Sequence, residues 1–324
     1  MSAIVFTAVI TFSRYQTNEF GVTCAIILTS SSPTVPTSWT KEDLLKQADM
    51  AMYKAKDAGR NAVQFFDPQM QILVSKRAQL VSDLYDAIQQ QQFVLYYQPQ
   101  VDVNNTILGY EVLLRWSQPE KGMISPAEFI PLAEETGLIV PIGEWLLEQA
   151  CKTLASWAAN PQREKLTIAV NISVVQFNRN DIVGTVIETL KRTGADPERL
   201  KLEITETLLA SNVPDVKAKM RALQAYGVSF SIDDFGTGYS SLAYLKQLPI
   251  NQLKIDQGFV RDITNNANDQ AIAQAVITLA DSMRLHVIAE GVETQEQKAL
   301  LQKMGCQAFQ GYLFGRPCRI EDLD

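Results

Sequence analysis

The sequence is poor in the side chains that most often build metal clusters and catalytic triads. It has a single histidine, His286, and four widely separated cysteines. The cysteines are Cys24, Cys151, Cys306 and Cys318. Because none forms a C-x-x-C pair, a zinc ribbon or a redox motif is disfavoured, and reduced, partly buried thiols in a cytosolic protein are expected. His286 lies in an apolar run, so it is expected to be a strand residue. A His-rich metal cluster, a Ser/His/Asp triad and an HD-type phosphohydrolase centre all need more than this sequence offers.

The chain also lacks an excess of positive charge and any long hydrophobic run. Its 29 basic and 36 acidic residues give a formal net charge of −7, which disfavours binding to nucleic-acid polymers. An anionic substrate is still compatible with this charge if bound cations invert the local field. Residues 3–12 (AIVFTAVITF) are apolar but too short to span a membrane, and no basic segment precedes them. A buried strand explains this run at least as well as a weak targeting signal. We therefore expect no direct membrane insertion and a cytoplasmic location, although a longer parent protein could be membrane-anchored.

The distribution of turn-forming and periodic segments predicts two parts, residues 1–70 and 71–324. A breaker-rich loop at 30–38 precedes a helix that opens at 40–43, and 62–66 has the composition of a strand. A second helix is expected over 70–91. Thereafter strands alternate with helices, as in a parallel α/β sheet. Strands are expected near 93–98, 108–115, 166–172, 200–204, 228–233, 251–255, 286–290 and 307–310. Helices are expected near 126–135, 141–159, 179–193, 212–225, 239–246, 267–283 and 294–303. Because the turn Asn104-Asn105 indicates a hairpin, the second part is predicted to be a β/α barrel that departs from strict alternation at its start.

Seven of the expected strands end in a residue that can bind a metal or take part in catalysis. These are Glu111, Asn171, Glu203, the pair Asp233-Asp234, Lys254, Glu290 and Gln310. In a β/α barrel the strand C-termini converge on one face, so these side chains would meet in one pocket. Carboxylates, amides and one lysine are suited to divalent-metal hydrolysis of a phosphate ester.

Each of these signals has an ordinary structural explanation when it stands alone. The Asp233-Asp234 pair could belong to a turn with a helix cap, and acids three residues apart, such as Glu203 and Glu206, are stabilised at a helix start. Asn171 could form an Asx turn, and Lys254 could be a surface lysine. Glu290 and Glu293 repeat this spacing. Three strand-end acid pairs in one barrel are harder to explain as solvated surface. Arg115 lies four residues after Glu111 on the same strand face, from which its guanidinium could bind a phosphate.

These residues lie in seven motifs that together resemble a known family. The motifs are 111–116 (EVLLRW), 170–173 (VNIS), 202–206 (LEITE), 233–242 (DDFGTGYSSL), 253–256 (LKID), 289–293 (AEGVE) and 310–317 (QGYLFGRP). In this order they resemble the EAL-domain cyclic di-GMP phosphodiesterases over roughly residues 75–320. The resemblance implies an α/β fold, a modified TIM (β/α)8 barrel with one antiparallel strand. It also implies hydrolysis of cyclic di-GMP to linear pGpG with Mg²⁺ or Mn²⁺ in a two-metal site.

The resemblance also implies roles for individual residues. The first metal would be held by Glu111, Asn171, Glu203 and Asp233, with Asp233 bridging to a second metal held with the help of Asp234. Lys254 would contact the attacking water, Glu290 would serve in metal binding or water activation, and Glu206 would anchor the 233–242 loop. The positions similar to substrate-binding ones are Gln98, Leu113, Arg115, Glu293 and Gln310, of which Gln310 also resembles a residue that supports the metal ligands. One departure is the motif Glu-Val-Leu in place of Glu-Ala-Leu, where Val112 need only pack.

The N-terminal part resembles a different family. Residues 43–61 (DLLKQADMAMYKAKDAGRN) look like the C-terminal helix of a GGDEF, or diguanylate cyclase-like, domain, but the GGDEF signature is missing. The piece is therefore expected to be a small N-terminal α/β fragment unable to make cyclic di-GMP. It is a truncated part of a longer protein, the product of a shortened gene, or a relic. An incomplete α/β unit has unpaired strand edges, so residues 1–39 are expected to be poorly ordered or packed against a neighbour.

Two other functions stay open on the sequence. A cyclic di-GMP receptor would bind the nucleotide without cleaving it, although such relatives usually lose metal ligands that are kept here. A barrel glycosidase would use paired carboxylates without a metal, but Lys254, Asn171 and the doubled acids suit metals better. The resemblance also implies a homodimer formed through the 233–242 loop and nearby helices.

Overall fold

The computed structural model describes residues 40, 46, 51, 52, 66–210, 213–236 and 245–323. The chain divides into two units, residues 1–83 and 84–324. Most of the described residues of the first unit belong to helix α2 (Pro68–Gln89), which continues into the second unit and corresponds to the helix expected at 70–91. The GGDEF-like helix and the segment 1–39 lie almost wholly outside the described residues. Those predictions, and the boundary at 70/71, stay predictions.

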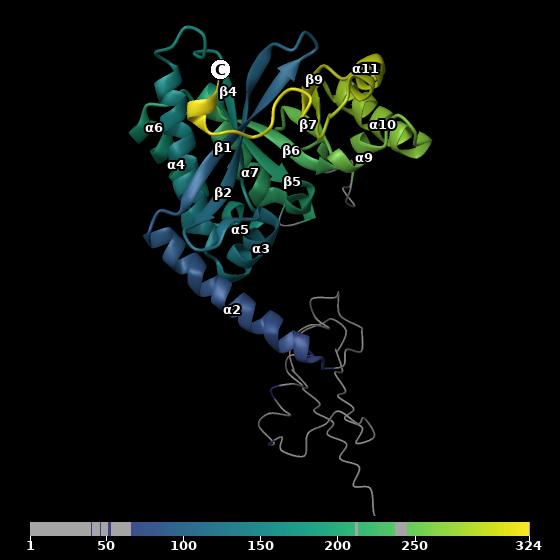
Figure 1. Ribbon diagram of the computed structural model, residues 1–324. Coiled ribbons are helices and arrows are strands. Elements are labelled where there is room, and N and C mark those ends of the chain that lie inside the picture. Colours follow the sequence, from purple (N-terminus) through teal and green to yellow (C-terminus); the bar gives the residue numbers. More distant parts are fainter. Residues whose placement is uncertain are drawn as a thin grey trace, which may run out of the picture. The chain divides into compact units, whose positions relative to one another are not determined.

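The second unit is a closed barrel of eight strands, and helices surround it (Figure 1). Its strands are β1 (Phe93–Asp102), β2 (Ile107–Gln118), β4 (Thr167–Asn171), β5 (Leu200–Thr205), β6 (Ser229–Phe235), β7 (Gln252–Ile255), β8 (His286–Ala289) and β9 (Ala308–Gln310). The order β1-β9-β8-β7-β6-β5-β4-β2 is closed by pairing of β1 with β2. Strand β1 is antiparallel to both neighbours, and the other ring neighbours are parallel. The predicted modified barrel with one antiparallel strand is thus confirmed.

The antiparallel strand enters the barrel through the expected hairpin. The carboxylate of Asp102 accepts hydrogen bonds from the backbone N–H groups of Asn104 and Thr106, both at 2.8 Å. Asn105 adopts a left-handed conformation (φ 64°), which asparagine tolerates better than most residues. A short strand that the sequence analysis missed, β3 (Gly122–Ile124), pairs with the end of β2 outside the ring.

The helices follow the strands in the alternating order that the sequence predicts. They are α3 (Pro126–Thr136), α4 (Ile139–Trp157), α5 (Val174–Phe177), α6 (Ile182–Thr193), α7 (Val213–Ala225), α9 (Gln257–Arg261), α10 (Ala267–Met283) and α11 (Gln295–Met304). Three short 3-10 segments are Pro197–Arg199, Glu206–Ala210 and Ile320–Asp322. The sequence analysis did not predict α5 and α9, which are too short to show helical periodicity. The helix expected at 239–246 lies mostly outside the described residues. In the described part of the chain, no helix has both the length and the apolar character that a membrane crossing requires.

Several strands are apolar on their outer face and carry polar side chains on their inner face. In β5, Leu200, Leu202 and Ile204 are fully buried under the helices, while Lys201 and Glu203 alternate with them. The interior of an ordinary β/α barrel is filled by branched apolar side chains, so a polar interior indicates a site rather than a core. Val112, the departure from the Glu-Ala-Leu motif, is 1 % exposed and belongs to the apolar core.

Candidate functional site

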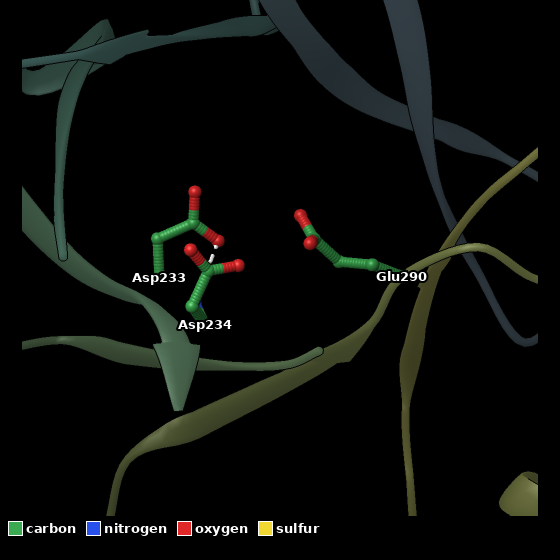
Figure 2. Close-up of side chains that lie close together, drawn as sticks. All are labelled: Asp233, Asp234 and Glu290. Carbon is green, nitrogen blue, oxygen red and sulfur yellow. Dashed lines mark hydrogen bonds between the residues drawn. The ribbon is translucent and has the colours of Figure 1, made fainter. Parts of the chain in front are cut away.

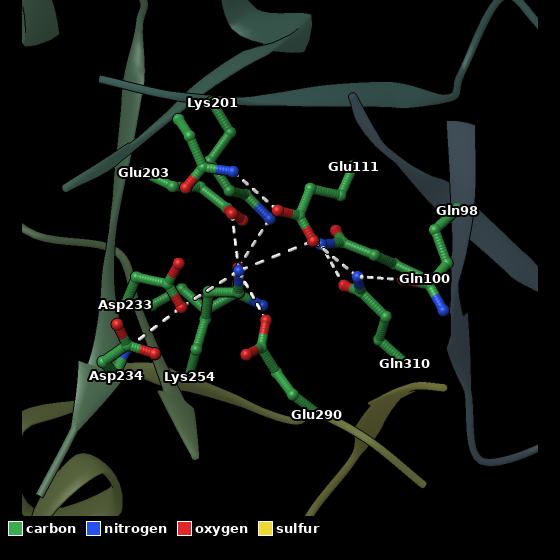
Figure 3. Close-up of polar contacts among 12 residues, drawn as sticks. Gln98, Gln100, Glu111, Lys201, Glu203, Asp233, Asp234, Lys254, Glu290 and Gln310 are labelled. Carbon is green, nitrogen blue, oxygen red and sulfur yellow. Dashed lines mark hydrogen bonds and ion pairs between the residues drawn. The ribbon is translucent and has the colours of Figure 1, made fainter. Parts of the chain in front are cut away.

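The predicted site residues come together at the C-terminal ends of the parallel strands (Figure 3). The strand register accounts for this, because Asn171 pairs with Glu203, and Thr205 with Asp233, on neighbouring parallel strands. On the antiparallel side, Gln98 of β1 lies opposite Glu111 of β2. Side chains from seven strands (β1, β2, β4, β5, β6, β7 and β9) and from the loop after β8 therefore face one pocket.

The ammonium group of Lys254 lies at the centre of this pocket. It is 2.5 Å from a carboxylate oxygen of Glu203 and 2.5 Å from one of Glu290. It is also 3.1 Å from Asp233 and 3.8 Å from Glu111. Lys254 is fully buried, which excludes the alternative that it is an ordinary surface lysine. Burial by itself lowers the pKa of Lys254, but the four acids hold that pKa well above its usual value.

A set of amide side chains holds Glu111 from the opposite side. Asn171 Nδ2 donates to one oxygen of Glu111 at 2.6 Å, and Gln310 Nε2 donates to the other at 2.5 Å. Gln310 also donates to Gln98 Oε1 and accepts from Gln100 Nε2, both at 3.0 Å. Both oxygens of Glu111 are thus oriented by a network that spans β1, β2, β4 and β9.

The more exposed side of the cluster is formed by three carboxylates, two of which also contact Lys254. Oxygen atoms of Asp233, Asp234 and Glu290 all lie within 4.8 Å of one another (Figure 2). Asp234 is left-handed (φ 53°), and its N–H donates to Asp233 Oδ1 at 3.0 Å. A non-glycine residue in this conformation is costly, and such strain concentrates at functional sites. The bend lets two consecutive residues of β6 approach Glu290 together.

The residues present fit divalent cations. Glu111, Glu203, Asp233, Asp234 and Glu290 provide five carboxylates around one central ammonium group. One oxygen of Glu203 is buried without a hydrogen-bond partner, so it is available to bind a cation. Hard cations such as Mg²⁺ and Mn²⁺ prefer this set of oxygen ligands.

Burial, together with the neighbouring carboxylates, raises the pKa values of three acids of the cluster. Burial, opposed by Lys254, raises the pKa of Glu203 to about 8. Burial and the neighbouring Asp233 raise the pKa of Asp234 to about 6, and burial raises the pKa of Glu290 well above its usual value. A bound cation would relieve this cost by stabilising the ionised forms.

The surroundings of the remaining predicted residues differ from one residue to the next. Glu206 Oε2 accepts a hydrogen bond from the N–H of Gly236 at 3.2 Å, near the start of the 233–242 loop. Leu113 follows Glu111 on β2 and is partly buried. Arg115 is also partly buried; it donates to the carbonyl of Leu114 at 2.9 Å, and its guanidinium lies 5.6 Å from the centre of the Tyr96 ring. Glu293 is exposed in the loop after β8. The catalytic, metal-binding and substrate-binding roles given to all these residues stay predictions.

Three polar residues that the sequence analysis did not select also belong to the barrel interior. Gln100 is 2 % exposed and fixes Gln310, as described above. The second is Lys201, which lies two residues before Glu203, and burial lowers its pKa. The third is Gln252, which lies two residues before Lys254 and whose Oε1 accepts a hydrogen bond from Lys201 at 2.7 Å. Strand alternation could have identified them, because each is two positions from a selected residue and therefore faces the same side.

The protein is a modified β/α barrel with a cluster of carboxylates at the ends of its strands. Residues 81–317 match the family described as EAL domain, and the chain belongs to this family.

Curated relatives that share this domain are considerably longer than the chain. It is 44% identical over 285 residues to the bifunctional diguanylate cyclase/cyclic di-GMP phosphodiesterase MucR of Pseudomonas aeruginosa, covering 88% of this chain and 42% of MucR. It is 40% identical over 284 residues to the cyclic di-GMP phosphodiesterase NbdA of the same organism, covering 87% of this chain and 36% of NbdA. The chain thus spans about two fifths of the length of the curated relatives it matches.

Two solved structures show the same barrel. The MucR phosphodiesterase in complex with c-di-GMP superposes with a TM-score of 0.74 at 44% identity, covering 76% of this chain and all of that one. The EAL enzyme Bd1971 with cAMP and cyclic di-GMP bound gives a TM-score of 0.74 at 32% identity, covering 88% of this chain and 75% of that one.

Proposed function

We propose that this chain is a metal-dependent phosphodiesterase that hydrolyses cyclic di-GMP to linear pGpG in bacterial second-messenger signalling. The observation that carries the proposal is the cluster of five carboxylates around Lys254 at the strand ends of an EAL barrel. It is supported by relatives named as cyclic di-GMP phosphodiesterases and by a similar structure that contains c-di-GMP.

The donor set would accommodate two cations of Mg²⁺ or Mn²⁺. Glu111, Asn171, Glu203 and Asp233 would hold the first, and Asp234 and Glu290 would hold the second together with Asp233. When bound, the cations would neutralise the phosphodiester and make the attacking water more acidic. The chain's own contribution is to fix the ligands, since Gln310 and Asn171 hold both oxygens of Glu111 in place.

Lys254 would act on the reacting groups directly. Its ammonium group is buried among four acids, so its charge is available at a fixed point of the pocket rather than in solvent. There it would orient the attacking water and stabilise negative charge that develops on the phosphate. The water oxygen would bond to phosphorus, the bond from phosphorus to one ribose oxygen would break, and that oxygen would leave with a proton. A carboxylate of the cluster would accept the proton that the water loses, and this proton would then pass to the leaving oxygen.

The substrate would be held by residues at the rim of the pocket. Gln98, Leu113, Arg115, Glu293 and Gln310 are the positions proposed to contact it, with Arg115 suited to a phosphate. Glu206, through its bond to Gly236, would hold the 233–242 loop next to the acids. A homodimer formed through this loop, and a cytoplasmic site of action, complete the proposal.

The test compares the wild-type chain with Glu111→Ala and with Glu120→Ala, an exposed acid on the same β2–β3 hairpin. Each protein is incubated with cyclic di-GMP and Mn²⁺, and pGpG is measured by chromatography. We expect the Glu111 variant to lose at least about 100-fold in rate, because it lacks a metal ligand, and the Glu120 variant to retain full activity. Most of the activity surviving in the Glu111 variant would refute the assignment of the site. Tight binding of the nucleotide by the wild type without turnover would instead favour a receptor.

A further inference from the structure

Gln297 is a buried side chain of α11 that forms hydrogen bonds with the end of α9 and with the end of the loop after β8. It is 6 % exposed. Its Oε1 accepts hydrogen bonds from the N–H groups of Glu293 and Thr294 at 2.7 and 2.9 Å. Its Nε2 donates to the carbonyls of Val260 and Arg261 at 3.2 and 3.0 Å. The amide therefore makes four hydrogen bonds to two segments that are more than 30 residues apart in sequence.

These two segments follow the strands that place Lys254 and Glu290. Val260 and Arg261 end α9, the helix immediately after β7, which carries Lys254. Glu293 and Thr294 end the loop after β8, which begins at Glu290. Lys254 and Glu290 contact each other at 2.5 Å inside the pocket. Outside the pocket, Gln297 joins the helix that follows the Lys254 strand to the loop that carries Glu290.

The loop after β8 is fixed at two further points against the same neighbour. The N–H of Glu290 donates to the carbonyl of Ile255 at 3.1 Å. Gly291 is left-handed (φ 64°), and a Cβ on it would lie 2.6 Å from Cβ of Gln257 at the start of α9. The start of the loop is thus set by β7 and α9, and its middle by the hydrogen bonds of Val292 with Gln310 and Leu313. Gln297 holds its far end against α9.

We propose that Gln297 is a positioning residue for Glu290. By holding residues 290–294 against α9, it sets where the Glu290 carboxylate lies relative to Lys254, Asp233 and Asp234. The positioning role stands on the contacts of the chain itself. Its consequence for hydrolysis rests on the function proposed above.

Helix capping alone does not account for these contacts. Gln297 and Thr294 form a capping box at the start of α11, in which Thr294 Oγ1 accepts from the N–H of Gln297 at 3.2 Å. Of the four hydrogen bonds of the Gln297 amide, the capping box needs only the one that Gln297 Oε1 accepts from the N–H of Thr294. The two donations to α9 lie outside it, and they tie the loop to the strand of Lys254. Substitution of Thr294 removes only a capping bond, whereas substitution of Gln297 removes a capping bond and the bonds to α9. A comparison of the two variants therefore separates the capping role from the positioning role.

The experiment compares three variants of the full chain. Gln297→Met keeps the length of the side chain and loses all four bonds. Thr294→Val removes the other half of the cap but leaves the Gln297 amide in place, and Gln302→Met changes an exposed glutamine of the same helix. Calorimetric titration with Mn²⁺, hydrogen exchange of residues 288–294, thermal unfolding, and kcat and KM for cyclic di-GMP are measured for each.

We expect Gln297→Met to weaken Mn²⁺ binding by about tenfold and to lower kcat by a similar factor with little change in KM, as substitution of residues that support metal ligands commonly does. Faster exchange in residues 288–294 should accompany these losses. Thr294→Val should lower the unfolding temperature with near-normal Mn²⁺ binding, and Gln302→Met should resemble the wild type.

Wild-type Mn²⁺ affinity and kcat in Gln297→Met, with only a lowered unfolding temperature, would overturn the proposal. If Gln297→Met does not fold, Gln297→Glu replaces it, because this variant keeps the acceptor for Glu293 and Thr294 and loses only the donations to α9. Undiminished Mn²⁺ affinity in that variant would then overturn it. A wild type that binds Mn²⁺ but hydrolyses no cyclic di-GMP would refute the proposed function, while the Mn²⁺ and exchange measurements would still decide the role of Gln297.

Discussion

Replacement of Lys254 by methionine should destabilise the metal-free protein and leave the metal-bound protein much less affected. The ammonium group is the central positive charge among Glu203, Glu290, Asp233 and Glu111, at 2.5, 2.5, 3.1 and 3.8 Å. Methionine has a similar length and no charge. Without the lysine, the acids must either repel one another or take up protons.

The expected loss can be estimated from the burial of these groups. Lys254 and Glu203 are fully buried, so solvent screens their interaction very little. Removal of one partner of a buried ion pair commonly costs about 3–5 kcal/mol. For a domain of this size each kcal/mol lowers the unfolding temperature by about 2–4 °C, so the variant should unfold roughly 6–20 °C below the wild type in EDTA.

The assay is thermal unfolding of both proteins in EDTA and in millimolar Mn²⁺. Because divalent cations supply positive charge to the same carboxylates, Mn²⁺ should raise the unfolding temperature of the variant more than that of the wild type and narrow the difference. Equal unfolding temperatures in EDTA would refute the view that Lys254 neutralises the cluster. A difference that Mn²⁺ leaves unchanged would refute the view that cations bind to these acids.

Three other substitutions or treatments test separate parts of the account. Asp234→Asn should remove one of two Mn²⁺ binding events in a calorimetric titration, since the amide keeps the shape and loses the charge; two unchanged events would argue against a second cation at this residue. Glu206→Gln should lower kcat by about tenfold without a large change in unfolding temperature, because the bond to Gly236 weakens when the carboxylate charge is lost; normal kcat would show that this anchor is dispensable. Iodoacetamide at pH 8, followed by peptide mass spectrometry, should modify the partly exposed Cys318 and leave Cys306 unmodified until denaturant is added, because burial raises the pKa of Cys306 to about 12 and covers its sulfur. Early labelling of Cys306 would show that the region around β8 and β9 opens readily.

The sequence predicts the barrel and its polar strand ends because both depend on local patterns. Alternation of strands and helices is visible along the chain, and the convergence of parallel strand ends then brings Glu111, Glu203 and Asp233 together without knowledge of any contact. The turn at Asn104-Asn105 likewise predicts a hairpin, and with it a departure from strict alternation at the start of the barrel. These features follow from residue order alone.

Other features depend on contacts between distant segments, and the sequence does not predict them. The central position of Lys254 among four acids follows from how the strands close into a ring. The bonds of Gln297 to Val260 and Arg261 join residues more than 30 positions apart. Short elements such as β3, α5 and α9 lack the length for a periodic signal, since tertiary contacts define them.

The most direct test of the central claim is hydrolysis of cyclic di-GMP by the wild-type chain in Mg²⁺ or Mn²⁺, in EDTA, and after the cation is restored. The account predicts pGpG as the product, its loss in EDTA, and its return when the cation is added back in excess. Hydrolysis that continues in EDTA would contradict the claim that the carboxylate cluster works through bound cations.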